Sequence, residues 1–265
     1  MATPAATIAP PSTAVWLAVL VHTLLGTALI AGGTNALNQV AERDVDALMH
    51  RTRGRPLPAG RLTPAAATVF AWTIALAGLL ELAAFVNVTT ALLAAATLVS
   101  YVYAYTPLKR RTTLATLVGA VPGALPIVGG WAAAGAPLDV RAGALFGLMF
   151  LWQIPHFLAL AWIYRDDYAR AGLQMLSVGD EDGGATFRQA TLNAAALLPV
   201  GLVPFVLGMA GAVYFAGTLV LSAGLFALAL VAARAPSATN ARRLFLATLV
   251  YLPAILSLMA ANRTA

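Results

Sequence analysis

Three oxygen-bearing side chains, Asn38, Glu42 and Asp46, follow one another at intervals of four residues at the end of an apolar stretch. On a continuous helix they would stay within an arc of about 80°, so all three would share one face. Amide and carboxylate oxygens suit a hard divalent cation, and Mg²⁺ completes its ligand shell with water and substrate phosphate. We therefore predict that these residues are catalytic and bind Mg²⁺. The alternative is a set of helix-end charges at a membrane surface, which fits Asp44 better because Asp44 falls off the stripe.

A second polar group, His156, Asp166 and Asp167, closes a later apolar stretch. His156 and Asp167 are eleven residues apart. That spacing is close to three helical turns, so the two would share a face, with His156 about 16 Å deeper. We predict that Asp166 and Asp167 are catalytic and that Asp167 is a further metal ligand. For His156 two interpretations stay open: a functional group facing a cavity, or a histidine that is hydrogen-bonded to a neighbouring hydroxyl.

Basic residues in two loops could hold an anionic group. Arg51 and Arg55 flank Gly54 in a segment with loop character, and Lys109, the only lysine in the chain, precedes Arg110. Guanidinium groups match phosphate oxygens in shape and charge. We predict that these four residues bind diphosphate, although each could equally serve only to orient the chain in a membrane.

Carboxylates and arginines at the mouth of an apolar chamber favour one reaction, the ionisation of an allylic diphosphate. A metal ion and basic side chains would take up the charge that develops on the leaving group. The chamber would hold the isoprenoid tail and exclude water.

The amino-acid composition indicates the class of protein that positions these residues. Of the 265 residues 60% are hydrophobic and 10% are charged, whereas a soluble domain carries about 25% charged residues. The chain is therefore predicted to be an integral membrane protein. Continuous apolar runs exclude a transmembrane barrel. The formal net charge of +6 sits in short loops without a basic stripe, so no nucleic-acid partner is expected.

We predict an all-α fold, a polytopic bundle of about eight transmembrane helices. A disordered tail is expected at 1–13, and a single transmembrane domain at 14–265. The predicted spans are 15–41, 63–105 (two helices that break near Asn87), 114–135, 142–164, 189–233 (two helices that break near 208–211) and 244–261.

Charge placement predicts the orientation. Fourteen of the sixteen Lys and Arg residues fall in the predicted loops 41–62, 106–112, 165–188 and 234–243. By the positive-inside rule these loops are cytoplasmic, and both termini of an eight-span chain lie outside. Eight of the ten acidic residues fall on the same side, so we predict a multi-pass protein of the bacterial inner membrane with its site facing the cytoplasm.

The first motif resembles that of the UbiA-type intramembrane prenyltransferases. Within that superfamily, three further stretches resemble the protoheme IX farnesyltransferase (heme O synthase) branch, and the resemblance covers roughly residues 30 to 260. The motifs are Asn38-x3-Glu42-x3-Asp46 followed by Arg51-Thr-x-x-Arg55-Pro-Leu, then Tyr105-Thr-Pro-Leu-Lys-Arg-Arg-Thr112, Pro155-His156-Phe157, and Asp166-Asp167-Tyr-Ala-Arg-Ala-Gly172 with Met175-Leu176.

This resemblance implies that farnesyl passes from farnesyl diphosphate to a vinyl group of heme B and that water adds to give heme O. The product would feed heme A synthase or terminal oxidase assembly. His156 would then serve the heme acceptor. Two departures stand out: Glu42 replaces the usual Asp, and the motif closes the first helix, whereas the family's nine-helix fold has it on the second. The opening helix is therefore expected to be missing from this sequence.

Two other functions are weighed against this one. A UbiA-type enzyme that prenylates an aromatic quinone precursor would share the first motif but usually carries more acids in the second, where this chain has Phe157, Tyr164 and Tyr168. A small transporter could use a similar charged mouth, but the sequence shows no inverted repeats or broken helices.

Overall fold

The computed structural model describes residues 12–264. The predicted tail therefore lies almost entirely outside the described residues. Within them the chain is helical, and the only extended pairing is an isolated bridge between Ala210 and Arg263. Eight helices of this part are long and apolar enough to cross a membrane, which confirms the expected all-α bundle.

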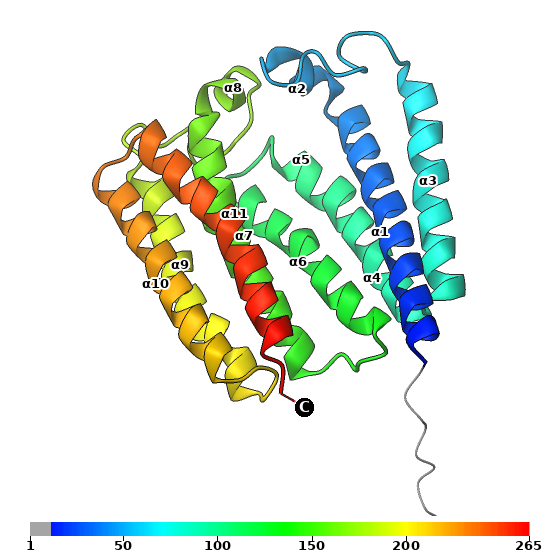
Figure 1. Cartoon of the computed structure of the whole chain (residues 1–265). Helices are drawn as coiled ribbons and strands as arrows, with labels where there is room; N and C mark the ends of the chain where they lie inside the picture. Colours follow the sequence, from blue (N-terminus) through cyan, green and yellow to red (C-terminus); the bar gives the residue numbers. More distant parts are fainter. Residues whose placement is uncertain (1–11, 265) are drawn as a thin grey trace, which may run out of the picture.

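The long helices follow the predicted spans closely, and two short helices sit between them (Figure 1). A π-helical segment (Ser100–Tyr105) and the short helix α5 (Thr106–Leu108) continue α4 to form one span. The remaining helices are α1 (Thr13–Ala41), α2 (Arg43–Leu48), α3 (Pro64–Phe85), α4 (Val88–Val99), α6 (Ala115–Ala133), α7 (Val140–Ile163), α8 (Arg165–Arg170), α9 (Gly184–Val206), α10 (Ala212–Arg234) and α11 (Ala238–Ala261).

The two predicted breaks are confirmed. Asn87 separates α3 from α4: its side-chain oxygen accepts from the N–H of Thr90, and its amide donates to the carbonyl of Ala132. This is an N-cap that also ties the turn to α6. Gly208, with φ of +67°, lies in the break between α9 and α10, where a left-handed conformation favours glycine.

Two helices begin earlier than predicted. Helix α9 begins at Gly184, not 189, and α11 at Ala238, not 244, so Arg188, Arg242 and Arg243 lie on helices and not in loops. The apolar run alone set the predicted boundaries, but capping groups add a polar first turn. Asp180 accepts from the N–H of Thr186 at 2.6 Å, and Ser237 accepts from that of Asn240 at 3.2 Å. Both caps satisfy N–H groups that a helix leaves unpaired.

Helices α1 and α3 approach each other through small residues. A Cβ on Gly33 would lie 2.7 Å from the carbonyl oxygen of Ala71, and a Cβ on Gly78 would lie 2.6 Å from that of Gly26. Such close approach is how membrane helices gain packing energy without a hydrophobic drive between them.

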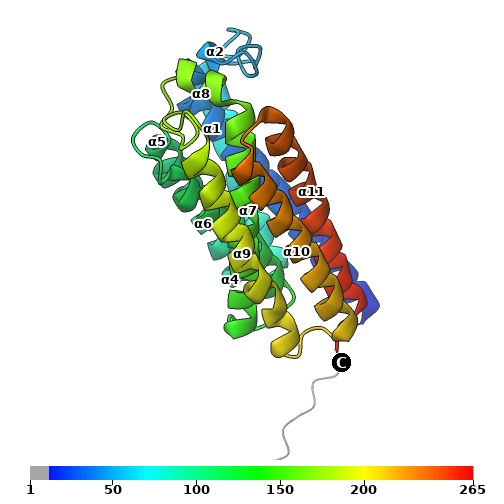
Figure 2. The ribbon, with the colours of Figure 1, turned by 90° about the vertical axis from the view of Figure 1, so that its left-hand side faces the viewer.

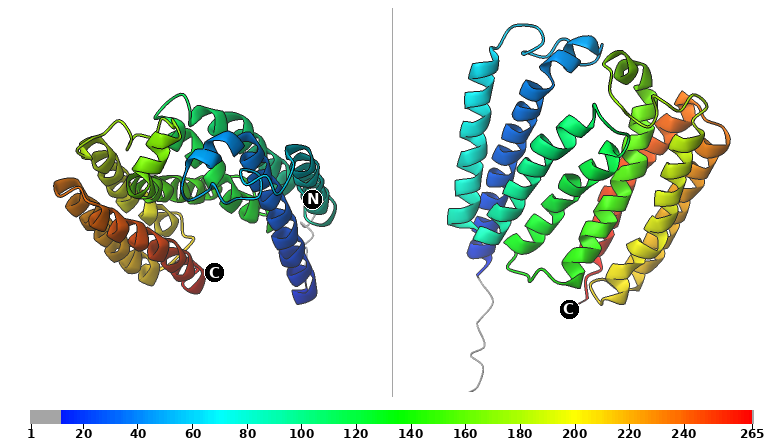
Figure 3. Two further views of the ribbon diagram at one scale, coloured as in Figure 1. Left: turned by 90° about the horizontal axis from the view of Figure 1, so that it is seen from above. Right: turned by 180° about the vertical axis from the view of Figure 1, so that it is seen from behind.

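Seen from the side, the long helices run side by side with a common tilt (Figure 2). Seen from above, they form an open arc, with α1 in one arm and α10 and α11 in the other (Figure 3). Helices α2 and α8 lie together at one end of the bundle, while α1 begins and α11 ends at the opposite end (Figure 1). We call the end that carries α2 and α8 the acidic end.

Candidate active site at the acidic end

The first predicted motif does not lie on one continuous helix. Helix α1 ends at Ala41, Glu42 has φ of −105° and ψ of 9°, and α2 begins at Arg43. The i to i+4 backbone bonds nevertheless cross the break, since Glu42 donates to Asn38 and Asp46 donates to Glu42. The chain therefore bends without losing the helical spacing. Asn38, Glu42 and Asp46 are all buried, with exposed fractions of 8%, 6% and 1%.

A hydrogen-bonded chain joins this motif to the 105–109 segment. The amide of Asn38 donates to Glu42 at 2.9 Å, and the hydroxyl of Thr106 lies 2.9 Å from the side-chain oxygen of Asn38. The other carboxylate oxygen of Glu42 lies 2.5 Å from Nζ of Lys109. Lys109 also lies 4.8 Å from the ring centroid of Tyr105. Lys109 is thus in direct contact with the acidic stripe, the name used here for Asn38, Glu42 and Asp46.

Asp46 is held from the following loop. Arg55 donates to its carboxylate at 2.8 Å, and the hydroxyl of Thr52 donates to its backbone carbonyl at 2.9 Å. The guanidinium of Arg55 remains about one-third exposed while Asp46 is enclosed. Arg55 can therefore reach the carboxylate and an anion outside it from the same position.

Asp167 binds the same loop from α8. Its carboxylate accepts from the backbone N–H of His50 at 3.2 Å and of Arg51 at 3.4 Å, and from Arg170 at 2.9 Å. Desolvation by burial raises the pKa of this carboxyl, but the two backbone bonds and the Arg170 charge outweigh it and hold the pKa below its usual range. Asp167 therefore stays ionised and fixes the loop that carries Arg51 and Arg55.

An apolar contact brings the two acid-bearing helices together. Val45 and Met49 of the first motif form one buried cluster with residues of the second: Ala161, Ala171, Leu173 and Met175. Tyr168 packs against this cluster. Burial raises the pKa of its phenol, so Tyr168 is a neutral hydrogen-bond donor near the acidic end.

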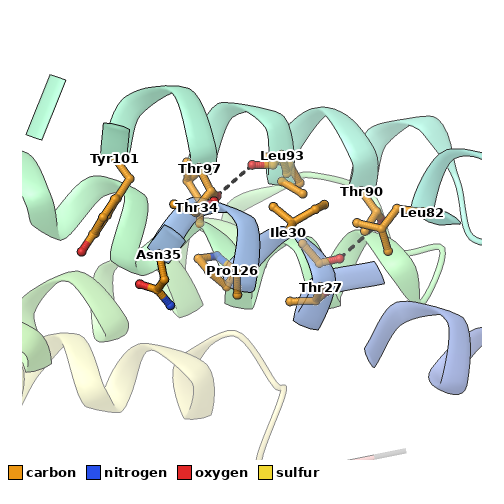
Figure 4. Close-up of a pocket in the computed structure, with 14 residues that line it drawn as sticks. Thr27, Ile30, Thr34, Asn35, Leu82, Thr90, Leu93, Thr97, Tyr101 and Pro126 are labelled. Carbon is orange, nitrogen blue, oxygen red and sulfur yellow. Dashed lines mark hydrogen bonds between the residues drawn. The ribbon is translucent and has the colours of Figure 1, made fainter. Parts of the chain in front are cut away.

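Two cavities lie within the bundle, and Tyr101 lines both; Tyr168 of α8 brings one of them to the acidic end. One, the central cavity, is lined by Tyr105, Gln153, Phe157 and Tyr168 among others. The other lies between α1, α4 and α6 (Figure 4). In the second cavity Thr34, Asn35 and Thr97 lie among Ile30, Leu82 and Leu93. Mostly apolar walls suit a hydrocarbon tail, whereas the charged residues Glu42, Arg110 and Arg111 line a third, outer hollow.

His156 does not share a helix face with Asp167. Helix α7 ends at Ile163, and Tyr164 turns the chain with φ of −107° and ψ of 21° before α8 begins, so the prediction that one continuous helix carries both residues was wrong. The turn lets Asp167 reach the loop after α2. The ring of His156 points instead to α11, where Nδ1 lies 2.8 Å from the hydroxyl of Thr248 and the ring stacks on Phe245.

The side chains of three other predicted residues form no ion pair with Glu42, Asp46 or Asp167 among the described residues. The side chain of Asp166 is 91% exposed beside Arg165. Arg51 lies over the ring of Tyr164, with its guanidinium carbon 5.1 Å from the centroid. Arg110 is exposed, but together with Glu42 and Thr106 it lines an outer hollow at the ends of α1 and α5.

Sequence reasoning missed Thr106, Gln153 and the tyrosines of the central cavity. Thr106 and Tyr105 lie in a stretch that resembles the protoheme IX farnesyltransferases. Nothing in their spacing showed that the π-helical turn directs Thr106 to Asn38 and Tyr105 to the central cavity. Outside the site, His22 and Glu81 form a pair at 2.7 Å between α1 and α3.

The described residues include the kinds of donor atom that Mg²⁺ prefers, but these atoms do not form a complete metal site. Asn38, Glu42, Asp46 and Asp167 offer the oxygen donors that Mg²⁺ prefers. No group of three or more His, Asp or Glu side chains within residues 12–264 is close enough to hold a metal ion by itself. Mg²⁺ is typically held by one or two carboxylates together with substrate phosphates and water, so a preformed cluster is not required.

The fold and this site define a polytopic membrane enzyme of the prenyltransferase class. The sequence model of the UbiA prenyltransferase family matches residues 1–255, and the chain belongs to that family. Two solved structures share the fold. A chain described under the biosynthesis of digeranylgeranylglyceryl phosphate synthase in membranes superposes with a TM-score of 0.76 at 13% identity, over 93% of this chain and 86% of that one. The apo structure of a UbiA homologue from Aeropyrum pernix K1 gives 0.71 at 21% identity, over 95% and 90%.

Curated relatives are closer in sequence. A protoheme IX farnesyltransferase of Solibacter usitatus is 48% identical over 244 residues, which is 92% of this chain and 84% of the relative. The enzyme of the same name from Sorangium cellulosum is 47% identical over 237 residues, covering 89% and 84%. The expected resemblance to the protoheme IX farnesyltransferases is confirmed, and the protein is an integral, multi-pass membrane prenyltransferase.

Proposed function

We propose that this prenyltransferase transfers the farnesyl group of farnesyl diphosphate to a vinyl group of heme B to make heme O. The names of relatives at 39–48% identity support these substrates. The observation that carries the proposal is the set of buried oxygen donors Asn38, Glu42 and Asp46, whose two carboxylates are paired with Lys109 and Arg55. A buried carboxylate paired with a movable basic side chain is suited to exchange that partner for a metal–diphosphate complex.

Asn38, Glu42, Asp46 and Asp167 would hold Mg²⁺. When bound, the metal would supply charge neutralisation at the diphosphate leaving group. Lys109 and Arg55 would turn from their carboxylates to phosphate oxygens, where a fork-shaped guanidinium and a compact ammonium both bind well. Arg51 and Arg110 are proposed to extend this diphosphate site at its rim, and Asp166 to contribute from the exposed side of α8.

Farnesyl would lie in the apolar cavities, with its reacting carbon near Tyr101, Tyr105 and Tyr168. Aromatic faces carry negative charge density, which stabilises an adjacent cation. Breaking the carbon–oxygen bond there leaves an allylic cation that the vinyl group attacks. Tyr168, as a neutral donor, can hydrogen-bond to the departing phosphate oxygens.

His156 is proposed to serve the heme. Thr248 engages Nδ1, and no described residue engages Nε2. Metal-binding histidines typically have one ring nitrogen oriented by a second group while the other ligates the metal. His156 could thus ligate the heme iron and present the vinyl edge to the cavity.

The site is proposed to face the cytoplasm of a bacterial inner membrane, because most cations lie in or next to the loops of the acidic end. The decisive experiment is an extract of expressing membranes supplied with farnesyl diphosphate and Mg²⁺. Heme that gains a farnesyl group supports the proposal. Prenylation of an aromatic acid and not of heme would assign the chain to the quinone-precursor branch.

A further inference from the structure

Gln153 is the one amide that lines the central cavity, and the proposed mechanism gives it no task. It lies in the middle of α7 with 3% of its surface exposed. Its Nε2 donates to the carbonyl of Ala120 at 2.9 Å and to that of Met149 at 3.1 Å. Both amide protons are therefore used on backbone groups, and a flipped amide would set its oxygen against two carbonyl oxygens, which would repel it.

The orientation of the amide leaves its oxygen as a fixed acceptor. None of the described residues 12–264 donates a hydrogen bond to Oε1. Gly123 of α6 makes room for this oxygen, because a Cβ on Gly123 would lie 2.0 Å from it. One turn earlier on α6, a Cβ on Gly119 would lie 2.6 Å from the ring of Tyr105. The Gly119–Gly123 stripe thus brings Tyr105 and the Gln153 oxygen to neighbouring positions on one wall.

The proposed reaction requires a hydrogen-bond acceptor in this cavity at one step only, the addition of water. The bond between farnesyl C1 and diphosphate oxygen breaks, and a new bond joins C1 to the outer vinyl carbon. The inner vinyl carbon, attached to the heme ring, is left as a cation. A water oxygen must then bond to that carbon, and one water proton must leave, which the released diphosphate can accept. Without a placed water, the cation loses a carbon-bound proton and becomes an alkene.

We propose that the Gln153 side-chain oxygen binds and orients the water that becomes the hydroxyl group of the product. A water that donates one proton to Oε1 turns a lone pair toward the cavity, where the cation forms. A buried hydrogen-bond acceptor binds a water molecule more readily than an apolar wall does. Thr116 and Tyr105 line the same cavity and offer further polar groups to this water. Gln153 is a positioning residue, and the inference rests on the proposed function.

The test measures the product rather than the rate. Membranes with Gln153→Met, which keeps the length of the side chain but removes the acceptor, are supplied with heme B, farnesyl diphosphate and isotopically labelled water. The ratio of farnesylated heme that lacks water to labelled heme O is expected to rise on the order of tenfold, the effect of losing one hydrogen bond of about 1.4 kcal/mol. Gly123→Ala, which displaces the oxygen, should shift the ratio in the same direction.

Asn193→Leu is the matched control. Asn193 also donates its amide to a backbone carbonyl inside a membrane helix, that of Gln189, but does not line this cavity. Its variant should leave the ratio unchanged. An unchanged ratio in both Gln153→Met and Gly123→Ala, with farnesylated heme still formed, would overturn the inference. Absence of any farnesylated heme from the unaltered protein would instead overturn the proposed function.

Discussion

Nζ of Lys109 lies 2.5 Å from a carboxylate oxygen of Glu42, and only about a tenth of either side chain is exposed. The pair joins the end of α1 to the segment after α5, and Asn38 binds the second oxygen of the same carboxylate. A buried carboxylate engaged on both oxygens is fixed in position. It can be released only if another cation takes the place of Lys109.

Breaking this pair from one side should destabilise the protein more than removing it entirely. We expect Lys109→Met to lower the free energy of unfolding by about 3 kcal/mol, because Glu42 is left charged and buried. The double variant Lys109→Met with Glu42→Gln should recover most of that loss. Thermal unfolding of the purified protein in one detergent provides the measurement. A double variant no more stable than Lys109→Met would show that the pair contributes through packing alone.

The buried acids of the first motif should matter more for turnover than the exposed one. Glu42→Gln and Asp46→Asn are expected to reduce turnover on the order of a hundredfold, as the loss of a group that stabilises transition-state charge does. Asp44, whose side chain is 73% exposed beside Arg43, is the matched control, and Asp44→Asn should change turnover less than about twofold. The rates are compared at equal amounts of inserted protein. Equal losses at all three positions would contradict the assignment of the buried face.

Replacing His156 should affect the heme substrate and leave the binding of farnesyl diphosphate unchanged. His156→Ala is expected to weaken heme binding or turnover by about tenfold, with the Mg²⁺-dependent affinity for farnesyl diphosphate unchanged. Thr248→Val keeps the ring but removes its hydroxyl partner, and should give a smaller loss of the same kind. Heme titrations and diphosphate binding are measured on each variant. Normal heme titrations in His156→Ala would return this residue to a packing role.

Orientation is open to a direct test. A reporter inserted at Gly183, in the turn before α9, should be cytoplasmic, and one at the C-terminus should be outside, because the cations gather at the acidic end. Reporter activity in cells distinguishes the two sides. An external Gly183 reporter would reverse the whole topology.

The sequence predicted the fold well because apolar runs of membrane length leave the backbone few options other than a helix. It identified both acidic motifs, but the contact between them is visible only in the structure. Helical spacing placed His156 below Asp167, whereas the turn at Tyr164 separates them. The roles of Thr106 and Gln153 depend on neighbours 68 and 33 residues away, and no local pattern contains that information.

Mg²⁺-dependent prenyl transfer to heme is proposed to occur at the acidic end. It is tested most directly by mass analysis of hemes extracted from membranes given farnesyl diphosphate, with and without Mg²⁺, for the unaltered protein and for Asp46→Asn. We predict that farnesylated heme forms only with Mg²⁺ and only weakly in the variant. Farnesylated heme formed equally without Mg²⁺, or equally by Asp46→Asn, would contradict the account.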